Sequence, residues 1–292
     1  MTETVTTDRP PAVTPPAPAA SPSLMRRLFT LREPPPPLVK RTVGFLGVGL
    51  AVLVWWILTY GATAETRIVS PVVLPSPGEV LRSIPALFTE RALVASTAAT
   101  LRRVITGFGL AIIVGVPLGI LAGAYRIFDA LTGPISVFLR NIPVAVLIPL
   151  TILWFGIDET QKTMFIFIAT APFVFFEAAR AVAGVHDRYV ETAQTLGATP
   201  RQVVMKVLIP LALPDIYNSL RNLFGLAFGY IMLAELVNAE HGLGYLLMTS
   251  QRRGLTEHIF AILIVIGLLA YGIDRLLYWF QRGLFPHRTD DE

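Results

Sequence analysis

Six apolar segments, each close to the length of a membrane-spanning helix, constrain this chain more than any other feature. They cover residues 43–60, 100–124, 131–156, 162–184, 216–237 and 258–280. A helix of about 20 apolar residues crosses the hydrocarbon core of a bilayer. The composition agrees, because 53% of the residues are hydrophobic and only 15% are charged, outside the usual range of soluble domains. The pattern predicts an all-α integral membrane protein with about six transmembrane helices.

The same pattern divides the chain into regions. The proline-rich stretch 1–41 cannot build a core, so we expect a disordered cytoplasmic tail, and the first transmembrane helix follows at 42–60. That helix starts too late for a signal peptide. The remaining regions are an external segment at 61–99, a membrane core at 100–285 and a short cytoplasmic tail at 286–292. Lysines and arginines are more numerous in the two termini and in every second connection between spans than in the other connections. This bias predicts that both termini are cytoplasmic.

The external segment contains one helix signal. Ser76 precedes Pro77, Gly78 and Glu79, and the apolar residues that follow have helical spacing. We expect an amphipathic helix that lies at the membrane surface, with a solvated loop as the alternative.

A polar element interrupts the apolar segments at residues 187–214. Asp187 can cap a short helix, and Gly197 stands where a C-terminal glycine belongs. Thr199, with proline next and Gln202 three residues on, predicts a second helix start with a capping box. Pro210 and Pro214 are expected to stop that helix. Two short helices with one apolar face suit contact with another protein, although a simple link between two spans explains the pattern equally well.

The residues of this element resemble a known signature. Glu191-Thr192-Ala193, three residues, Gly197, nine residues and Val207-Leu208-Ile209-Pro210 are similar to the EAA motif of permease subunits of bacterial ABC importers. The spacing matches without a gap. Thr192, Val207 and Ile209 replace the usual alanine, isoleucine and leucine with residues of similar bulk.

The resemblance covers most of residues 70–285 and points to one branch. The stretches at 74–80, 107–123, 140–157 and 234–247 look like permeases for nitrate, sulfonates, taurine and bicarbonate. One departure is Phe228, because an aromatic residue at that position, seven before Glu235, is commonly tryptophan in the branch.

The resemblance implies a type I ABC importer permease (MetI-like) fold with a cytoplasmic coupling helix, in the bacterial inner membrane. It also implies partners: cytoplasmic ATPase subunits, a second permease subunit in a homodimer, and a periplasmic or lipid-anchored binding protein. The chain has no phosphate-binding loop of the GxxxxGK[ST] type, so we expect that it is not an enzyme and binds no cofactor, and that the partner ATPase uses ATP and magnesium. The residues expected to couple to the ATPase are Glu191, Ala193, Gly197, Arg201, Lys206, Val207 and Pro210. For Arg201 and Lys206, a role as solvated cytoplasmic charges is an equal alternative.

Polar residues within the predicted spans are candidates for the translocation path, since such residues face protein or water. They are Arg140, Asn141, Glu177, Arg221, Asn222, Phe228 and Glu235. Arg140 either supplies positive potential to the path of a small anion or forms a buried pair with a carboxylate.

Other classes of protein fit less well. The bases flank apolar segments and form no stripe, so nucleic acid is not an expected partner, and the histidines and absent cysteines predict no metal site. No constellation for an integral-membrane enzyme is found. The expected substrate is a small anionic or zwitterionic nutrient, with a heterocyclic vitamin precursor or, less favoured, a stand-alone secondary transporter as alternatives.

Overall fold

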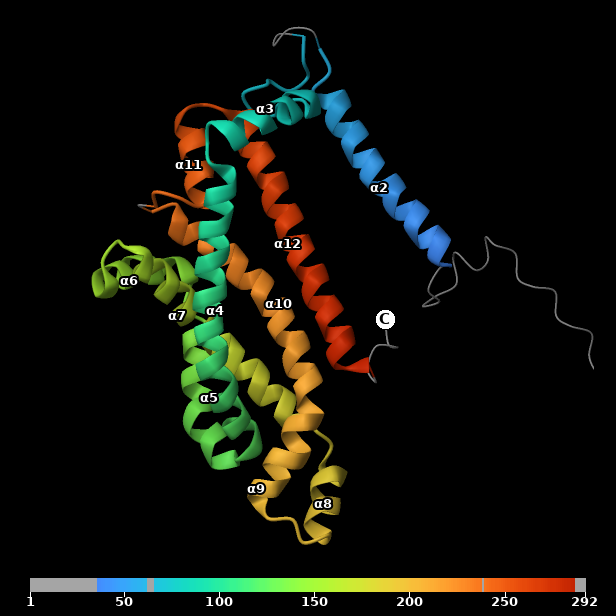
Figure 1. Ribbon diagram of the computed structural model, residues 1–292, viewed down its shortest axis with the longest axis vertical. Helices are drawn as coiled ribbons and strands as arrows, with labels where there is room; N and C mark the ends of the chain where they lie inside the picture. The colour runs from blue at the N-terminus through green and yellow to red at the C-terminus, as the bar shows by residue number, and fades with distance from the viewer. Residues whose placement is uncertain (1–35, 62–65, 238, 287–292) are drawn as a thin grey trace, which may run out of the picture. The chain divides into compact units, whose positions relative to one another are not determined.

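The computed structural model describes residues 36–61, 66–237 and 239–286. All regular structure in these ranges is helical (Figure 1), which confirms the predicted fold class. The tail predicted for 1–41 lies outside the described residues as far as residue 35. The same holds for residues 62–65 of the predicted external segment and for 287–292 at the C-terminus.

The chain forms two compact units, Met1–Trp55 and Trp56–Glu292. The described part of the first is most of helix α2 (Pro37–Leu58), which is long and apolar enough to span a membrane from Leu38 to Leu58. The helix starts earlier than the apolar run because proline is well tolerated in a first helical turn.

The second unit holds the remaining described helices. In chain order they are α3 (Pro77–Thr89), α4 (Leu93–Ala124), α5 (Arg126–Arg140), a 3₁₀ turn (Val144–Val146), α6 (Leu147–Phe155), α7 (Glu159–Ala183), α8 (Asp187–Thr195), α9 (Pro200–Val203), a π-helical turn (Val204–Leu208), α10 (Ile209–Glu235), α11 (Leu243–Arg252) and α12 (Thr256–Leu284).

Five helical stretches in the described residues can each cross a membrane, and a sixth candidate is broken. The third predicted span, 131–156, is not straight, because α5 and the helix that follows it meet at 86°. The break falls at residues 141–143, where Pro143 lacks a backbone N–H and restricts the residue before it. Up to six spans follow if the bent pair counts as one.

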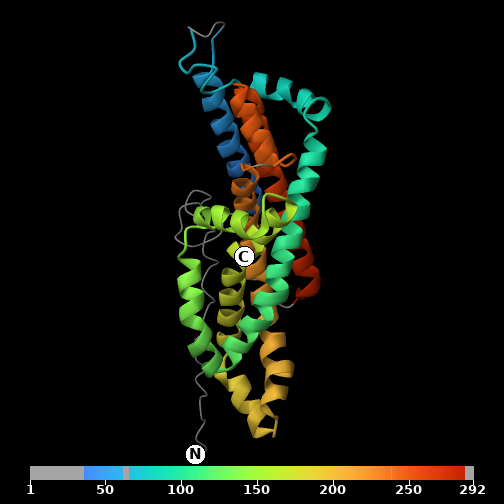
Figure 2. The ribbon, with the colours of Figure 1, turned by 90° about the vertical axis from the view of Figure 1, so that its left-hand side faces the viewer.

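Helix α7 packs along α4, and the contact is made through small residues. Gly107, Gly115, Gly119 and Gly123 of α4 all face α7 so closely that a Cβ atom at any of them would overlap α7 atoms. A Cβ at Gly119, for example, would lie 2.7 Å from the Cβ of Ala178. Small residues at helix contacts allow close backbone approach in membranes. Figures 1 and 2 show α4, α7 and α10 together along the unit.

Helix α3 begins where the sequence predicts. The Ser76 side chain accepts a hydrogen bond from the backbone N–H of Glu79, and the Glu79 side chain accepts one from the N–H of Ser76. Val80 and Leu87 are buried on the face that includes the contact with α12, while Leu81 remains exposed. The amphipathic helix therefore covers the end of α12 with one face only.

Candidate functional site

Residues 187–208 form a compact hairpin, which we call the coupling hairpin. Helix α8 starts at Asp187, the residue predicted as its cap, because the cap lies one residue earlier: the His186 side chain accepts a hydrogen bond from the Arg188 N–H. The hairpin turns at Gly197, whose φ of +82° lies in the region that favours glycine. The predicted capping box of the second helix is present, since Thr199 and Gln202 exchange hydrogen bonds.

The predicted stop at Pro210 and Pro214 is wrong, since both prolines lie within a continuous helix. Helix α9 continues through the π-helical turn into α10, and the whole stretch Pro200–Glu235 is one candidate span of 36 residues. In the π-helical turn the N–H of Ile209 donates to the carbonyl of Val204, five residues back. Pro210 follows this turn directly, and the wider turn lets the helix continue past a residue that has no N–H to donate. The second helix of the hairpin is therefore the beginning of a membrane helix.

The apolar face of the coupling hairpin packs against its own chain. Val203 and Leu208 are buried in a cluster with Ala178 and Val182 of α7, and Ala193 is partly buried against that cluster. Most of this face is therefore not available to a partner protein. At the hairpin tip, next to Gly197, the side chain of Leu196 is 82% exposed.

The structure places the predicted coupling residues in two groups. Glu191, Gly197, Arg201, Lys206 and Pro210 are exposed, whereas Ala193 and Val207 are half-buried. Leu196 is not among the predicted coupling residues: its helical spacing from Val190 and Ala193 predicts a place on the same apolar face, but in the structure it is exposed.

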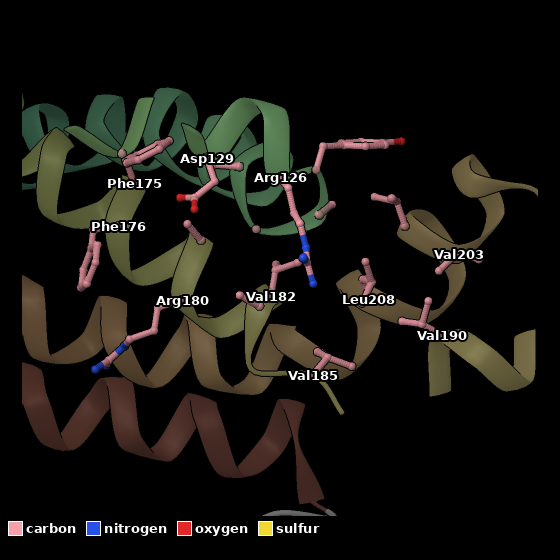
Figure 3. Close-up of a pocket in the computed structure, with 18 of the residues that line it drawn as sticks. Arg126, Asp129, Phe175, Phe176, Arg180, Val182, Val185, Val190, Val203 and Leu208 are labelled. Carbon is pink, nitrogen blue, oxygen red and sulfur yellow. The ribbon is translucent and has the colours of Figure 1, made fainter. Parts of the chain in front are cut away.

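A cavity of about 980 Å³ lies between the coupling hairpin and the start of α5. Arg126 and Asp129 of α5 line one side, while Val190 and Leu208 of the hairpin line another. Figure 3 shows the Arg126 side chain extending from α5 toward Val182 and Leu208. The hairpin is therefore packed on the α7 side and has open space on the α5 side.

The predicted path residues of α10 do not share one environment. Asn222 is exposed, but Phe228 is buried at 3% exposure and Glu235 is buried at 1%. The guanidinium of Arg221 makes two bonds to Asp274 of α12, with Nε–Oδ1 and Nη2–Oδ2 distances of 2.6 and 3.1 Å. A cavity of about 320 Å³ between α10 and α12 includes Arg221, Asn222 and Phe228 in its lining.

One exposed stripe does run along α10. Its members are polar or small and follow each other at intervals of three and four residues: Asp215, Asn218, Asn222, Gly225 and Gly229. A Cβ at either glycine would meet nothing within 4 Å. Polar side chains on a membrane helix face protein or water and not lipid, so this stripe marks a face of α10 that lipid does not cover.

Glu177 of α7 lies near the same helix. Its carboxylate accepts hydrogen bonds from Ser219 of α10, at 3.0 Å, and from Arg180, at 2.6 Å. Asp215 and Asn218 share a cavity of about 260 Å³ with Glu177. The fourth predicted span therefore contributes a polar group beside the α10 stripe.

Arg140 ends α5 at the bend. Its guanidinium carbon lies 3.5 Å from the centroid of the Phe176 ring, a cation–π contact, and its Nε has no hydrogen-bond partner among the described residues. No carboxylate in that part of the chain forms an ion pair with it. Asn141 caps the same helix end by donating to the Val137 carbonyl at 2.7 Å.

The partner of Glu235 is Arg103, which lies near the start of the predicted span 100–124 and is not among the predicted path residues. Helix α4 starts at Leu93 and not at residue 100, so Arg103 is inside the bundle and 2% exposed. Its Nη1 donates to Glu235 Oε1 at 2.7 Å and its Nε to Glu159 Oε2 at 2.7 Å. The signal was available, since an acid in a membrane span needs a partner.

Comparisons with known proteins agree with this architecture. A family model described as "Binding-protein-dependent transport system inner membrane component" matches residues 115–288. The taurine transport system permease protein TauC of Escherichia coli is 32% identical over 253 residues, which are 85% of this chain and 90% of TauC. The bicarbonate transport system permease protein CmpB of Synechococcus elongatus is 29% identical over 247 residues, 82% of this chain and 87% of CmpB.

Among solved structures, an inward facing conformation of the MetNI methionine ABC transporter has a chain that matches with a TM-score of 0.59 and 25% identity. The match covers 68% of this chain and 97% of that chain. It confirms the predicted type I importer permease fold. The chain therefore belongs to the family of binding-protein-dependent transport system inner membrane components and is the permease subunit of an ABC importer.

Proposed function

We propose that this permease imports a small anionic or zwitterionic nutrient and takes its energy from a separate ATPase that docks on the coupling hairpin. One observation carries the docking site: Leu196 projects from the hairpin tip with 82% of its surface exposed. An exposed apolar side chain on a rigid, capped turn suits a pocket on a partner. The exposed charges of Glu191 and Arg201 flank it and suit the rim of such a contact.

The hairpin is built to move a membrane helix. From Pro200 to Glu235 the backbone is helical throughout, about 54 Å long at 1.5 Å per residue. A push at the hairpin therefore reaches the far end of α10 without a flexible link. The cavity beside Val190 and Leu208 supports this reading, because it leaves room for the hairpin to tilt toward α5.

The exposed stripe on α10 is the best candidate for the lining of the path. Asn218 and Asn222 offer amide donors, Gly225 and Gly229 leave open space beside the helix, and Asp215 at the hairpin end is the one acidic member of the stripe. Amide donors can bind an anion and release it again, whereas Arg221 is already neutralised by Asp274. The relatives named for taurine and bicarbonate support a substrate of that class. Glu177, beside this stripe, and Arg140, at the bend, remain candidates near the path.

The complete transporter needs partners. In the proposed assembly two permease subunits stand together in the bacterial inner membrane, with ATPase subunits below and a binding protein above. The ATPases use cytoplasmic ATP and magnesium, so the coupling hairpin that they contact faces the cytoplasm. The lysine and arginine distribution puts both termini on that same side. The far end of α10 then faces the binding protein.

The docking proposal is tested with Leu196→Asn in the permease co-expressed with its ATPase. Loss of a central anchor typically costs about 2 kcal/mol, or roughly a thirtyfold weaker association. We expect less ATPase to co-purify and substrate-stimulated ATP hydrolysis to fall. Leu81→Asn on α3 is the matched control, since Leu81 is also an exposed helix leucine but lies in a different part of the unit. Unchanged co-purification and hydrolysis with Leu196→Asn would refute the docking site.

A further inference from the structure

The far end of α10 is fastened by a buried polar cluster that the transport proposal does not use. The carboxylate of Glu235, the last residue of α10, accepts hydrogen bonds from three sources. Thr100 Oγ1 donates to Oε1 at 2.8 Å, Arg103 Nη1 donates to the same oxygen at 2.7 Å, and the backbone N–H of Gly244 donates to Oε2 at 2.9 Å. Both Arg103 and Glu235 are buried, so water does not replace these bonds.

The turn that follows α10 is shaped around this carboxylate. Gly242 has a φ of +135°, and a Cβ there would lie 2.5 Å from Glu235 Oε2. A Cβ at Gly244 would lie 2.8 Å from the Glu235 Cβ. Both positions therefore require glycine for the chain to close over the acid. This explains the His-Gly-Leu-Gly sequence at 241–244 better than a simple loop does.

The cluster joins four helices. Thr100 also accepts a hydrogen bond from the N–H of Leu243, the first residue of α11, at 3.0 Å. Arg103 donates to the His241 carbonyl at 2.7 Å and forms an ion pair with Glu159, the first residue of α7. The ends of α4, α7, α10 and α11 are thereby tied at one point. We call Thr100, Arg103, Glu159, Glu235 and the turn 242–244 the far-end joint.

Stability alone is a weak explanation for such a joint. Burying an ion pair costs desolvation that the attraction only partly offsets, and apolar side chains of the same size often stabilise a fold as well or better. Directional bonds do something that apolar packing does not, because they hold α11 in one register with respect to α10. That register matters if α10 is the helix that moves.

We propose that Glu235 and Arg103 are positioning residues for transport: they pass the displacement of α10 to α11 and so link the binding-protein side of the permease to ATP hydrolysis. This inference rests on the proposed function, since it needs the coupling hairpin to move α10. Neither residue contacts substrate in this role. A displacement at either end, the coupling hairpin or the turn after Glu235, reaches the other end through the continuous helix between Pro200 and Glu235.

Glu235→Gln tests the joint in the complete transporter reconstituted in lipid, with ATPase and binding protein. The amide keeps the shape and one acceptor but removes the charge that faces Arg103. We expect normal assembly and normal basal ATP hydrolysis, while stimulation by the loaded binding protein falls to near its unstimulated level. Gly242→Ala opens the same joint without changing a charge and should give the same result. Arg103→Gln should likewise lose the stimulation, and Arg103→Lys, which keeps the positive charge, should retain part of it.

The matched control is Glu79→Gln, which removes the carboxylate from another Arg–Glu pair, formed with Arg67 outside the joint. It should leave the stimulation ratio unchanged. If assembled Glu235→Gln and Gly242→Ala complexes keep the full stimulation ratio, or lose basal and stimulated hydrolysis in proportion, the joint is structural only and the inference is overturned. Failure of the docking proposal looks different, because Leu196→Asn would then leave ATPase association intact.

Discussion

Arg103, Arg140 and Arg221 lie within the membrane helices or at their ends, and the groups around each decide what it can do. Arg103 is matched by Glu235 inside the bundle, and Arg221 is matched by Asp274 on α12. Arg140 instead faces an aromatic ring. A buried charge that already has its counter-charge cannot attract a passing anion strongly. Among these three, Arg140 is the one whose positive charge meets no carboxylate in the described residues.

One ion pair outside the membrane spans predicts a pH effect. The Arg67 side chain, by hydrogen bonding, and the N–H of Ser76 lower the pKa of Glu79 from 4.5 to about 2. A carboxyl with a depressed pKa stabilises the fold above its unfolded pKa, and this contribution disappears as the pH falls through the folded pKa. Because Glu79 is partly exposed, we expect only about 1 kcal/mol at neutral pH.

The measurement is the thermal midpoint of the purified protein and of Glu79→Gln across pH. The two should differ at about pH 7 and converge as the pH falls from about 4.5 toward about 2, since the wild-type carboxylate is then protonated. A difference that persists unchanged at the acidic end would show that the charge of Glu79 is not responsible.

At the scale of whole helices, α4 and α7 form the most extensive contact, and α9, the π-helical turn and α10 together form the longest candidate span, with 36 residues. Four glycines of α4 face α7, and the repeat lets two membrane helices approach with their backbones nearly touching. The π-helical turn before Pro210 keeps α9 and α10 in one helix although a proline interrupts the usual bonding. The first feature gives the unit a rigid centre, and the second connects the coupling hairpin to the membrane.

A substitution in the α4–α7 contact should destabilise the protein. In Gly119→Ala the new Cβ would lie 2.7 Å from the Ala178 Cβ, so the two helices must separate. Overpacking of this kind costs about 1–3 kcal/mol, and we expect a lower thermal midpoint in detergent. Gly109→Ala is the matched control on the same helix, because a Cβ there meets nothing within 4 Å and alanine favours helix. Equal midpoints for the two variants would contradict this account of the contact.

At the scale of the whole molecule, the question is which faces meet water. Most exposed apolar side chains of the long helices suit lipid, but the α10 stripe does not. A transporter with a wet path through its centre explains such a stripe, and in the proposed assembly a second permease subunit would complete the wall around it. The family relationship and the polar stripe therefore support the same arrangement.

Cysteine labelling tests this arrangement directly, because the natural chain has no cysteine. In assembled complexes, Asn222→Cys should react with a hydrophilic maleimide at least about tenfold faster than Leu268→Cys, since a reagent dissolved in water reaches only wetted surfaces. Leu268 is the control because it is an exposed apolar residue of α12. Comparably slow labelling at both positions in all nucleotide states would rule out a wetted α10 face.

Local signals in the sequence were enough for much of the structure. The apolar lengths predicted the helices, Gly197 and Thr199 predicted the hairpin turn and its second start, and the motif spacing predicted the family. Two errors came from treating local rules as decisive. Pro210 did not end a helix, because the π-helical turn carries the helix past it, and α4 begins at Leu93, before the apolar run at residue 100, with Arg103 paired inside the bundle.

The sequence by itself determined the membrane-spanning helices and the capped hairpin, since length, periodicity and capping act over a few residues, while the permease family entered through the resemblance to the EAA motif. Only the tertiary structure decided which face of the hairpin is free and which carboxylate belongs to which arginine. Val203 turned inward and Leu196 outward, and Glu235 paired with a residue 132 positions earlier in the chain. Burial and charge pairing depend on distances between segments far apart in the chain, and no local pattern records them.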